Sequence, residues 1–445
     1  YNLCQIFFHF STLIVNKLTD YFLPIEMNNF YNNFDIQTFV DRKPNYRTIF
    51  QQDRDRIIYS FAFRRLQAKT QVFMSGEYDF YRTRLTHSIE VSQIGRSICN
   101  YLKKKCPNLS DDFFIDPDLV EAICLTHDIG HPPFGHAGES LLNDLMKNYG
   151  GFEGNAQTLR IITETISTRM GTIQGMNPSR AFMDGVLKYK ILYSQIDHAE
   201  NHFLYDDQVK YLDYIFAGRK FPDYLHLAKN LNKFRSIECQ IMDWADDTAY
   251  SLNDMIDSIK GGFLSFEKIE KWGKEQTLDK QESKLIDHLL IMIKEGDIDV
   301  QFSSKIGHFI EACDLKEKKT FMSDLTNRYN YLLTIDPDIA KECELYKRLS
   351  LDVVFNSPQL KQLVFKGRFM LRRIFDTFMD NYLDTQTPKL RLLPKDYEKA
   401  ILKQESPSYR ARMICDYIAG MTDRFAIRFY KRLFDPDFGS IVDLV

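Results

Sequence analysis

Apolar residues recur at helical spacing along most of the chain. Between residues 84 and 102 they fall three or four positions apart, and the same step returns at 119–127 and at 237–259. Side chains three and four residues apart share one face of an α-helix, so these stretches predict amphipathic helices. Alternation of apolar and polar positions is rare, and its best example, 70–74, precedes a Ser-Gly pair and predicts a short hairpin. The pattern predicts an all-α fold with at most one small β-hairpin.

The same pattern divides the chain into three predicted parts. Residues 1–45 are an N-terminal extension, whose first 26 residues are either a leader or a stretch upstream of a start at Met27, and they are assigned no function. Residues 46–265 form the predicted core. The Lys- and Glu-rich stretch that begins at 266 predicts solvated helices and a soft boundary. Residues 266–445 then continue as a C-terminal helical region, in which Leu360 to Leu383 resume helical packing.

The composition is that of a folded chain of 445 residues with nearly balanced charge. Hydrophobic residues make up 44% and charged residues 27%, which excludes a disordered or fibrous chain. With 58 basic and 61 acidic residues the formal net charge is -3, so any grip on phosphate groups must be local. Single-stranded DNA as an effector therefore has no support from the charge.

The cysteines and the apolar runs indicate in which cellular compartment the protein functions. The eight cysteines include no CxxC pair and no zinc-finger cluster, which favours free thiols in a reducing compartment and a cytoplasmic location. No stretch of about 18 apolar residues occurs, so no helix is predicted to span a membrane. The apolar-rich residues 7–15 have no basic flank before them and no small-residue cleavage site after them, so they do not predict a signal peptide.

The phosphate-loop, dinucleotide-binding, nucleophile-elbow and HExxH motifs are all missing from the chain. A histidine-rich run is instead the candidate for a catalytic or metal-binding site. Within 126–139 stand three of the ten histidines and two acids: His127, Asp128, His131, His136 and Glu139. His127 falls on the apolar face of a predicted helix that Gly130 and the two prolines after it should end. Imidazole beside carboxylate at such a helix end suits Mn, Fe, Co, Ni or Zn, and also Mg where oxygen ligands and water dominate.

Beyond that loop the chain can restart as a helix from Gly135. His136 and Glu139 would then lie on one face, so that the carboxylate could orient the imidazole. The alternative for this run is a polar loop that only caps two helices. His87 lies on the apolar face of the helix predicted over 84–102, and taken alone it reads as a core histidine bonded to the backbone.

An acidic run supplies a further candidate ligand. Asp246, Tyr250 and Asp254 follow one another every four residues, beside the apolar stripe of the same predicted helix. One carboxylate could complete a metal shell of two histidines and two aspartates, but spacing does not choose among Asp243, Asp246 and Asp247. The alternative is a solvated acidic helix face.

Seven basic residues precede His87 within 34 positions of the chain: Arg54, Arg56, Arg64, Arg65, Lys69, Arg82 and Arg84. Such charges usually lie on the surface. Here they could also face an anionic substrate, since arginine offers bidentate contacts to phosphate.

The ordered set of motifs resembles the deoxyguanosinetriphosphate triphosphohydrolase family of HD-domain phosphohydrolases, from about residue 46 to about residue 435. A lone His-Asp doublet is a weak signal, whereas this ordered set is a specific one. The matching runs are 53–58, 62–66, 69–73, 82–88, 127–139, 151–157, 187–189, 245–247 and 415–424.

The resemblance implies an all-α HD fold and the metal-dependent hydrolysis of a deoxynucleoside triphosphate, dGTP above all, to deoxynucleoside and inorganic triphosphate. It implies Mg or Mn as cofactor, with Fe, Co or Ni also compatible, and a homo-oligomer. The metal ligands it implies are His87, His127, Asp128 and Asp246, and the catalytic pair it implies is His136 and Glu139. The substrate contacts it implies are Gln71, Arg84, His131, Asn155, Lys188, Tyr189, Tyr250 and Asp254.

Two departures from the family pattern concern specificity. Lys190 stands where the family usually has proline, and 363–366 lacks the tyrosine expected near the base or phosphates. Base preference and regulation therefore stay open. Two other functions are alternatives: an HD phosphohydrolase of another nucleotide, and a non-catalytic nucleotide-binding regulator. His136 and Glu139 argue against the regulator, because a non-catalytic protein has no use for a general acid. The basic residues favour a nucleoside triphosphate over a shorter, less highly charged phosphoester.

Overall fold

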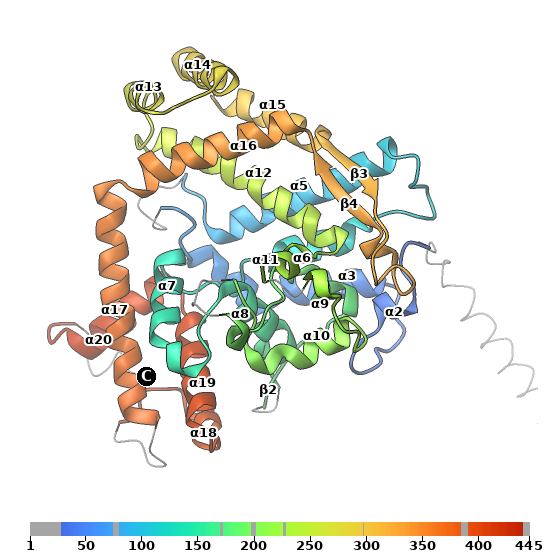
Figure 1. Ribbon diagram of the computed structural model, residues 1–445. Helices are drawn as coiled ribbons and strands as arrows, with labels where there is room; N and C mark the ends of the chain where they lie inside the picture. The colour runs from blue at the N-terminus through green and yellow to red at the C-terminus, as the bar shows by residue number, and fades with distance from the viewer. Residues whose placement is uncertain are drawn as a thin grey trace, which may run out of the picture.

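The computed structural model describes residues 28–73, 80–169, 172–196, 202–225, 228–296, 298–383 and 390–438, and helices dominate it (Figure 1). The α-helices are α2 (Asn33–Ile36), α3 (Ile49–Ile58), α4 (Phe61–Arg65), α5 (Arg84–Lys105), α6 (Pro117–Thr126), α7 (Gly135–Leu145), α8 (Gly154–Arg160), α9 (Arg180–Gly185), α10 (Val209–Ile215), α11 (Ala228–Lys233), α12 (Ile237–Lys260), α13 (Phe266–Glu275), α14 (Lys280–Glu295), α15 (Ile298–Glu311), α16 (Pro337–Leu349), α17 (Pro358–Tyr382), α18 (Lys395–Leu402), α19 (Pro407–Ala419) and α20 (Asp423–Phe434). Shorter 3₁₀ and π turns are η1 (Leu66–Ala68), η2 (Lys147–Tyr149), η3 (Ile161–Thr165), η4 (Tyr193–Gln195), η5 (Asp206–Gln208), η6 (Asp223–Leu225), η7 (Asn327–Tyr329) and η8 (Ser350–Phe355). The predicted all-α class is confirmed.

The extended structure forms two antiparallel ribbons. β1 (Ser167–Arg169) pairs with β2 (Thr172–Gln174), and β3 (Cys313–Glu317) pairs with β4 (Tyr331–Ile335). Neither ribbon was predicted, because strands of three to five residues are too short to show a period of two. The predicted hairpin at 70–74 is not a strand pair among the described residues: Thr70 and Thr83 form an isolated antiparallel bridge, and 74–79 lie outside them.

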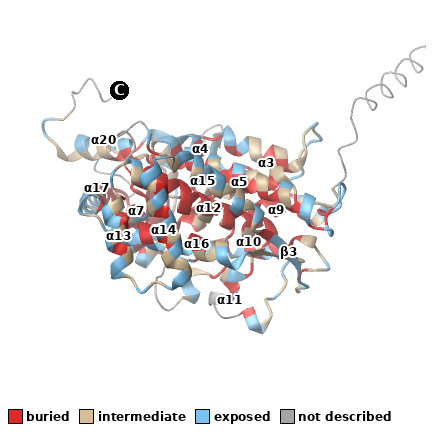
Figure 2. Ribbon diagram, turned by 90° about the horizontal axis from the view of Figure 1, so that it is seen from above, coloured by how far each residue is buried: buried red, intermediate tan, exposed pale blue. Residues whose placement is uncertain are grey.

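Three helices that pack on one another form the centre of the fold. α5 packs against α6, both pack against α12, and α15 and α16 cover α12 from another side. Figure 2 shows the buried residues running along α5 and α12. The apolar positions predicted to share one face of α5 are all buried: Val91, Ile94, Ile98 and Leu102. The helical period thus placed the core face of this helix correctly.

A second apolar cluster joins α7 to the C-terminal helices. Leu141 and Leu142 of α7 pack in one cluster with Leu371, Ile374 and Phe378 of α17, and α18 to α20 complete it. Figure 1 shows α17 running beside α7. α5, α6 and α12 belong to the first cluster together with Ala156 and Leu159 of α8. α8 links α7 to that cluster, because the backbone of Gly154 donates a hydrogen bond to Glu139 of α7. The division of the chain at 45/46 and 265/266 remains a prediction.

The described helices and cysteines bear on two of the predictions made from the sequence. None of the described helices combines the length and the apolar character that crossing a membrane requires. The cysteines among the described residues are all buried and carry free thiols: Cys99, Cys106, Cys124, Cys239, Cys313, Cys343 and Cys415.

Candidate active site

The first turn of α5 presents Arg84 and His87 to the interior. Thr83 caps this helix through reciprocal hydrogen bonds with Thr86, which fixes where the first turn begins. Both Arg84 and His87 are buried, at 3% and 1% exposure. Arg84 Nη1 donates a hydrogen bond of 2.7 Å to Asp128 Oδ2. The first turn of α5 is thereby joined to the turn that follows α6.

His127 and Asp128 follow directly on α6, as the glycine and the prolines after them predicted. The distance from His127 Nδ1 to the Cys124 carbonyl oxygen is 2.6 Å, so the N–H on this nitrogen donates to the backbone and leaves the Nε2 lone pair free. Gly130 lets α8 approach the turn, because a Cβ at this position would stand 2.1 Å from the carbonyl oxygen of Gly154. This close contact holds the His-Asp doublet against the start of α8.

Asp246 of α12 is the acid that lies beside the two histidines. Its Oδ1 is 3.1 Å from His87 Nε2 and 3.6 Å from His127 Nε2. The two acids that spacing left as alternatives point elsewhere: Asp243 pairs with Lys188 and Arg235, and Asp247 pairs with Lys347. Three-dimensional packing thus makes the choice that the sequence pattern left open.

These side chains form a donor set that fits a divalent cation. His87, His127 and Asp128 each bring a ligand atom within 4.8 Å of the others, and Asp246 reaches both histidines. His127 Nε2 is buried, and the described residues offer it no hydrogen-bond partner. A buried lone pair facing carboxylates is costly unless something electropositive stands between them. Imidazole and carboxylate ligands together suit divalent first-row transition metals such as Mn, Fe, Co, Ni and Zn.

The charges around this donor set keep its carboxylates ionised. Burial alone would raise the pKa of Asp128, but Arg84, His127 and His131 hold it well below its usual range. Burial would likewise raise the pKa of Asp246, yet Lys188 and the two histidines hold it well below normal. Lys188 Nζ bonds Asp246 Oδ2 at 2.9 Å, which leaves Oδ1 toward the histidines.

The first turn of α7 carries the His136–Glu139 pair. His136 Nδ1 lies 3.1 Å from Glu139 Oε2, while the imidazole itself is 81% exposed. Glu139 is buried and its Oε1 accepts a hydrogen bond from the Gly154 backbone. Burial opposes ionisation of Glu139, but the hydrogen bond to His136 and the charge of His131 lower its pKa to about 2. A fixed, ionised acid therefore orients a solvent-facing base.

His131 lies between this pair and the candidate metal ligands. Its Nδ1 is 3.0 Å from Asp128 Oδ1, and its Nε2 is 4.0 Å from Glu139 Oε2. Burial and the nearby Arg84 lower the pKa of His131. His131, His136 and Glu139 also form a second group whose donor atoms all lie within 4.8 Å. The predicted catalytic and metal-binding residues thus occupy one continuous site.

The α12 stripe extends this site away from the metal ligands. Asp254 is 3% exposed, and neither of its oxygens has a hydrogen-bond partner among the described residues. Burial raises the pKa of Asp254 to about 7, against the charge of His87. Gln71 Oε1, before α5 in the chain, is another buried acceptor without a hydrogen-bond partner among the described residues. The Tyr250 ring stacks on Phe355, with centroids 6.1 Å apart. Unpaired buried acceptors of this kind suit a ligand that donates hydrogen bonds.

Residues 153–155 contain a side chain that the sequence reading missed. Glu153 is 2% exposed; its Oε1 accepts from Asn155 Nδ2 at 2.9 Å, and its Oε2 accepts from the Ala156 backbone at 2.7 Å. Burial and the nearby Glu139 raise the pKa of Glu153 to about 8. Glu153 is the N-cap of α8, but glutamate is not among the residues that usually take this position, so capping preference gave no signal for it. Tyr189 is half-buried, and its ring lies under the Arg235 guanidinium.

The basic cluster predicted near His87 does not form one surface. Arg54 pairs with Asp118 and Glu121, and Arg82 pairs with Glu90 and Asp257. Arg56 donates to a backbone carbonyl, and the backbone carbonyl of His131 accepts from Lys69. Of the seven residues, Arg84 alone bonds a candidate metal ligand through its side chain in the described part of the chain. Sequence proximity overstated the cluster because helix turns send neighbouring side chains to different faces.

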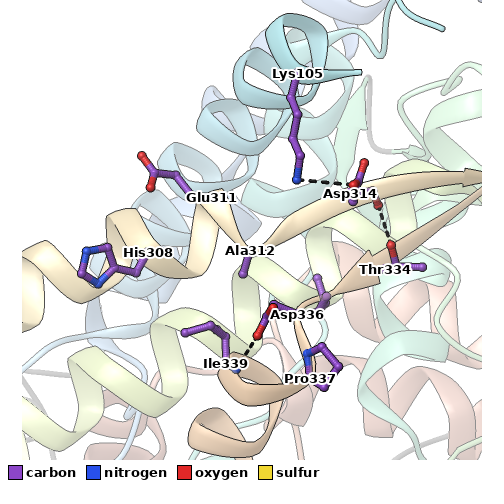
Figure 3. Close-up of a pocket in the computed structure, with 10 residues that line it drawn as sticks. Lys105, His308, Glu311, Ala312, Asp314, Thr334, Asp336, Pro337 and Ile339 are labelled. Atoms are coloured by element: carbon purple, nitrogen blue, oxygen red, sulfur yellow. Dashed lines mark hydrogen bonds and ion pairs between the residues drawn. The ribbon is translucent and has the colours of Figure 1, made fainter. Parts of the chain in front are cut away.

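A separate pocket of about 540 Å³ lies away from all of these residues. Figure 3 shows it between the end of α5, the end of α15 and the β3–β4 ribbon, where Lys105 faces Asp314 across its rim. Acidic and basic side chains both line it, and none of the predicted site residues does. Its size therefore does not make it the site of the chemistry.

Comparison with known proteins agrees with this geometry. A family model described as an HD domain matches residues 84–251, a range that includes all four candidate metal ligands. A model described as a phosphohydrolase-associated domain matches residues 333–432, which include α17, α18 and α19. The residues that these two family models match include members of both apolar clusters.

Relatives that align with most of the chain point to the same family. The chain is 34% identical over 443 residues to the deoxyguanosinetriphosphate triphosphohydrolase-like protein of Shewanella sediminis, an alignment that covers 91% of this chain and 96% of that protein. The corresponding protein of Shewanella woodyi is 36% identical over 438 residues, with the same coverage. At this identity over nearly the full length, the chain belongs to the family of deoxyguanosinetriphosphate triphosphohydrolase-like proteins and is an HD-domain phosphohydrolase.

Proposed function

We propose that the chain hydrolyses a deoxynucleoside triphosphate, with dGTP as the first candidate, to deoxynucleoside and inorganic triphosphate, using a divalent cation. The observation that carries the proposal is the arrangement of the acids: Asp128 and Asp246 each have one oxygen bonded by a cationic side chain and the other turned toward the histidines. The relatives are named for this substrate, and the site combines a cation-binding set with a solvent-facing histidine.

His87, His127, Asp128 and Asp246 are the residues that would hold the cation. When bound, such a cation polarises a phosphate oxygen and makes a water more acidic. Mg or Mn is the proposed metal, with Fe, Co or Ni also compatible with this ligand set. Arg84 Nη1 and Lys188 Nζ already neutralise the outer oxygens of the two acids, and both cations would also offset charge on a phosphate chain.

His136 is the proposed proton donor to the leaving 5′-oxygen. Attack of water at the α-phosphorus breaks the bond to O5′, and that oxygen needs a proton because an alkoxide is a poor leaving group. Glu139 holds His136 through Nδ1 and the imidazole is exposed, so Nε2 is the nitrogen that would give the proton to the substrate. In the alternative role, the same pair takes a proton from the attacking water. In either role of His136, Asn155 and His131 would contact the phosphate groups of the substrate.

The α12 stripe is the proposed sugar site. Asp254 and Gln71 offer buried, unpartnered oxygens that could accept a hydrogen bond from the 3′-hydroxyl. Tyr250 stands one turn before Asp254 on the same face and would press on C2′, so a ribonucleotide would be excluded by its extra hydroxyl. Tyr189, next to Lys188 in the chain and with its ring under the Arg235 guanidinium, is a candidate phosphate contact.

Product analysis tests this function directly. The purified chain is incubated with dGTP, the other deoxynucleoside triphosphates, GTP, dGMP and a cyclic nucleotide, each with Mg or Mn, and the products are separated by anion exchange. We expect inorganic triphosphate and deoxynucleoside from the deoxynucleoside triphosphates. Pyrophosphate with monophosphate would contradict the proposed bond cleavage, turnover of dGMP or of the cyclic nucleotide would favour another phosphoester, and no turnover at all would favour a regulator.

A further inference from the structure

A second pocket, of about 360 Å³, is lined largely by cationic side chains. It lies between the segment before α3, the inner face of α3 and residue 177, and no residue of the candidate active site lines it. Its lining consists of Asp41, Arg42, Lys43, Asn45, Arg47, Gln52, Arg56 and Asn177. Four positive charges, three amides and a single carboxylate thus face one small volume, with no aromatic or aliphatic side chain among them.

Two of the four cations have no carboxylate partner among the described residues. Arg56 donates only to the Met176 carbonyl oxygen, and Lys43 is exposed without an ion pair. Burial and the charges of Arg42 and Arg47 lower the pKa of Arg56, with Asp53 as the only neighbouring acid that opposes them. Since a guanidinium stays ionised at physiological pH, the pocket holds positive charge that the surrounding protein does not balance.

The wall of the pocket is rigid and keeps one donor free. Arg42 is anchored by Asp53 and by the carbonyl oxygen of Asn177, which leaves its side chain 5% exposed. Its Nε is buried and has no hydrogen-bond partner in the described part of the chain. The amide of Asn177 bonds the backbone of Val40 twice, from Nδ2 at 2.7 Å and to Oδ1 at 3.1 Å. Arg42 is therefore held in place before any ligand arrives.

We propose that this pocket binds a phosphate chain, separately from the active site. Several guanidinium groups in one polar cavity match the oxygens of a di- or triphosphate, which accept bidentate hydrogen bonds. A nucleobase would find no aromatic platform in this lining, so recognition rests on the phosphates. Both free inorganic phosphate chains and the phosphates of a nucleotide present this chemistry. The proposal does not depend on the proposed catalytic function.

Protection of Lys43 from chemical acetylation tests the proposal on the wild-type protein. The chain is treated with a limiting amount of an acetylating ester, with and without inorganic tripolyphosphate at constant ionic strength, and acetylation is quantified by mass spectrometry. We expect the rate at Lys43 to fall saturably, about tenfold when the ligand is near ten times its Kd. Lys104, exposed on α5, is the matched control and should react at an unchanged rate.

Two variants and two ligands sharpen the result. Arg47→Gln and Arg56→Gln should each weaken the protection of Lys43; Arg47 lies nearer the surface, so that variant keeps the test valid if Arg56→Gln does not fold. Equal protection by pyrophosphate and dGDP would assign the phosphates alone, and stronger protection by dGDP would assign a nucleotide as the source. Equal acetylation of Lys43 with and without tripolyphosphate, or equal protection of Lys104, would overturn the proposal.

Discussion

At the scale of single residues, three of the four candidate metal ligands are oriented by a second partner: His127, Asp128 and Asp246. The Nδ1 of His127 bonds a backbone carbonyl, one oxygen of Asp128 accepts from Arg84, and one oxygen of Asp246 accepts from Lys188. Each of these three ligands therefore has one atom bonded to the protein outside the ligand set and one atom left for a cation, whereas His87 Nδ1 has no hydrogen-bond partner among the described residues. Such outer partners fix the orientation of a ligand and the tautomer of a histidine. Replacing a ligand and replacing its neighbour should consequently have different effects.

Asp246→Asn should lose bound metal, whereas Asp243→Asn should retain it. The two acids stand one turn apart on α12 and both contact Lys188, but only Asp246 reaches the histidines. An amide is a far weaker ligand for a divalent cation than a carboxylate. Metal content of the purified variants by mass spectrometry measures the difference. Equal metal content in the two variants would remove Asp246 from the ligand set.

His136→Ala should keep the metal and the fold but lower kcat by about 10²–10⁴-fold, the usual contribution of a general acid or base. The side chain is 81% exposed, so its removal leaves no buried cavity. His308→Ala, an exposed histidine on α15, is the matched control and should leave kcat unchanged. Turnover rate, metal content and melting temperature are measured together. An unchanged kcat in His136→Ala would exclude it from proton transfer.

At the scale of elements, the site depends on how closely α8 approaches the turn after α6. The backbone of Gly130 donates to Thr158 Oγ1, and that hydroxyl donates to the carbonyl oxygen of His127. The start of α8 in turn donates to Glu139, so one helix end positions the metal doublet and the catalytic pair together. Glycine is needed at 130 because there is no room for a Cβ.

Gly130→Ala should destabilise the protein by about 3 kcal/mol or more, since added atoms in a packed site force the backbone apart. The new Cβ would meet the carbonyl oxygen of Gly154 at 2.1 Å and the backbone nitrogen of Thr158 at 2.4 Å. Gly307→Ala in α15 is the control: its Cβ would meet nothing within 4 Å. That change should stabilise the protein by about 0.5–1 kcal/mol through helix propensity. Urea unfolding compares the two, and equal stabilities would contradict the packing argument.

At the scale of the whole molecule, one buried arginine ties distant segments together. Arg328 is 1% exposed, pairs with Asp184 of α9 at 2.9 Å and with Glu238 of α12 at 3.1 Å, and lies 4.0 Å from Asp35 of α2. It also donates to the carbonyl oxygen of Ala181. Three acids from three helices thus share a single cation, and α9 leads directly to Lys188 in the candidate site.

Arg328→Met should lower the free energy of unfolding by about 3–5 kcal/mol, because it leaves buried acids without their counter-charge. Arg219→Met is the control, since its pair with Asp324 is solvent-exposed and should contribute little to stability. Urea midpoints of both variants, compared with the wild type, measure the two effects. Similar small losses in both would show that the buried network adds little.

The same network predicts a pH dependence. Burial raises the pKa of Asp35 from 3.8 to about 6, although Arg328 opposes the shift. Between these values the folded state binds the proton more readily than the unfolded chain, so this group's contribution to stability falls as pH rises from about 4 to about 6. The change is on the order of 3 kcal/mol. Asp35→Asn should lose this slope, and parallel stability curves for the variant and the wild type would contradict it.

Several features of the fold and site could be predicted from the sequence alone. The helical period correctly placed the core face of α5, and a glycine with two prolines marked the end of α6 just before His127 and Asp128. These are local properties, because capping, proline geometry and spacing act within a few residues. The pairing of His136 with Glu139 is local for the same reason, as both stand in one helical turn.

Other features depended on the tertiary structure. Spacing could not choose among the three acids of α12, and it suggested a single basic cluster where packing separates Arg54, Arg56 and Arg82. The cationic pocket likewise joins residues 41–56 to Asn177, far apart in the chain. The sequence alone determined which side chains each helix presents and on which face. Only the packing of helices decided which of those faces meet, because such contacts join residues that no local period relates.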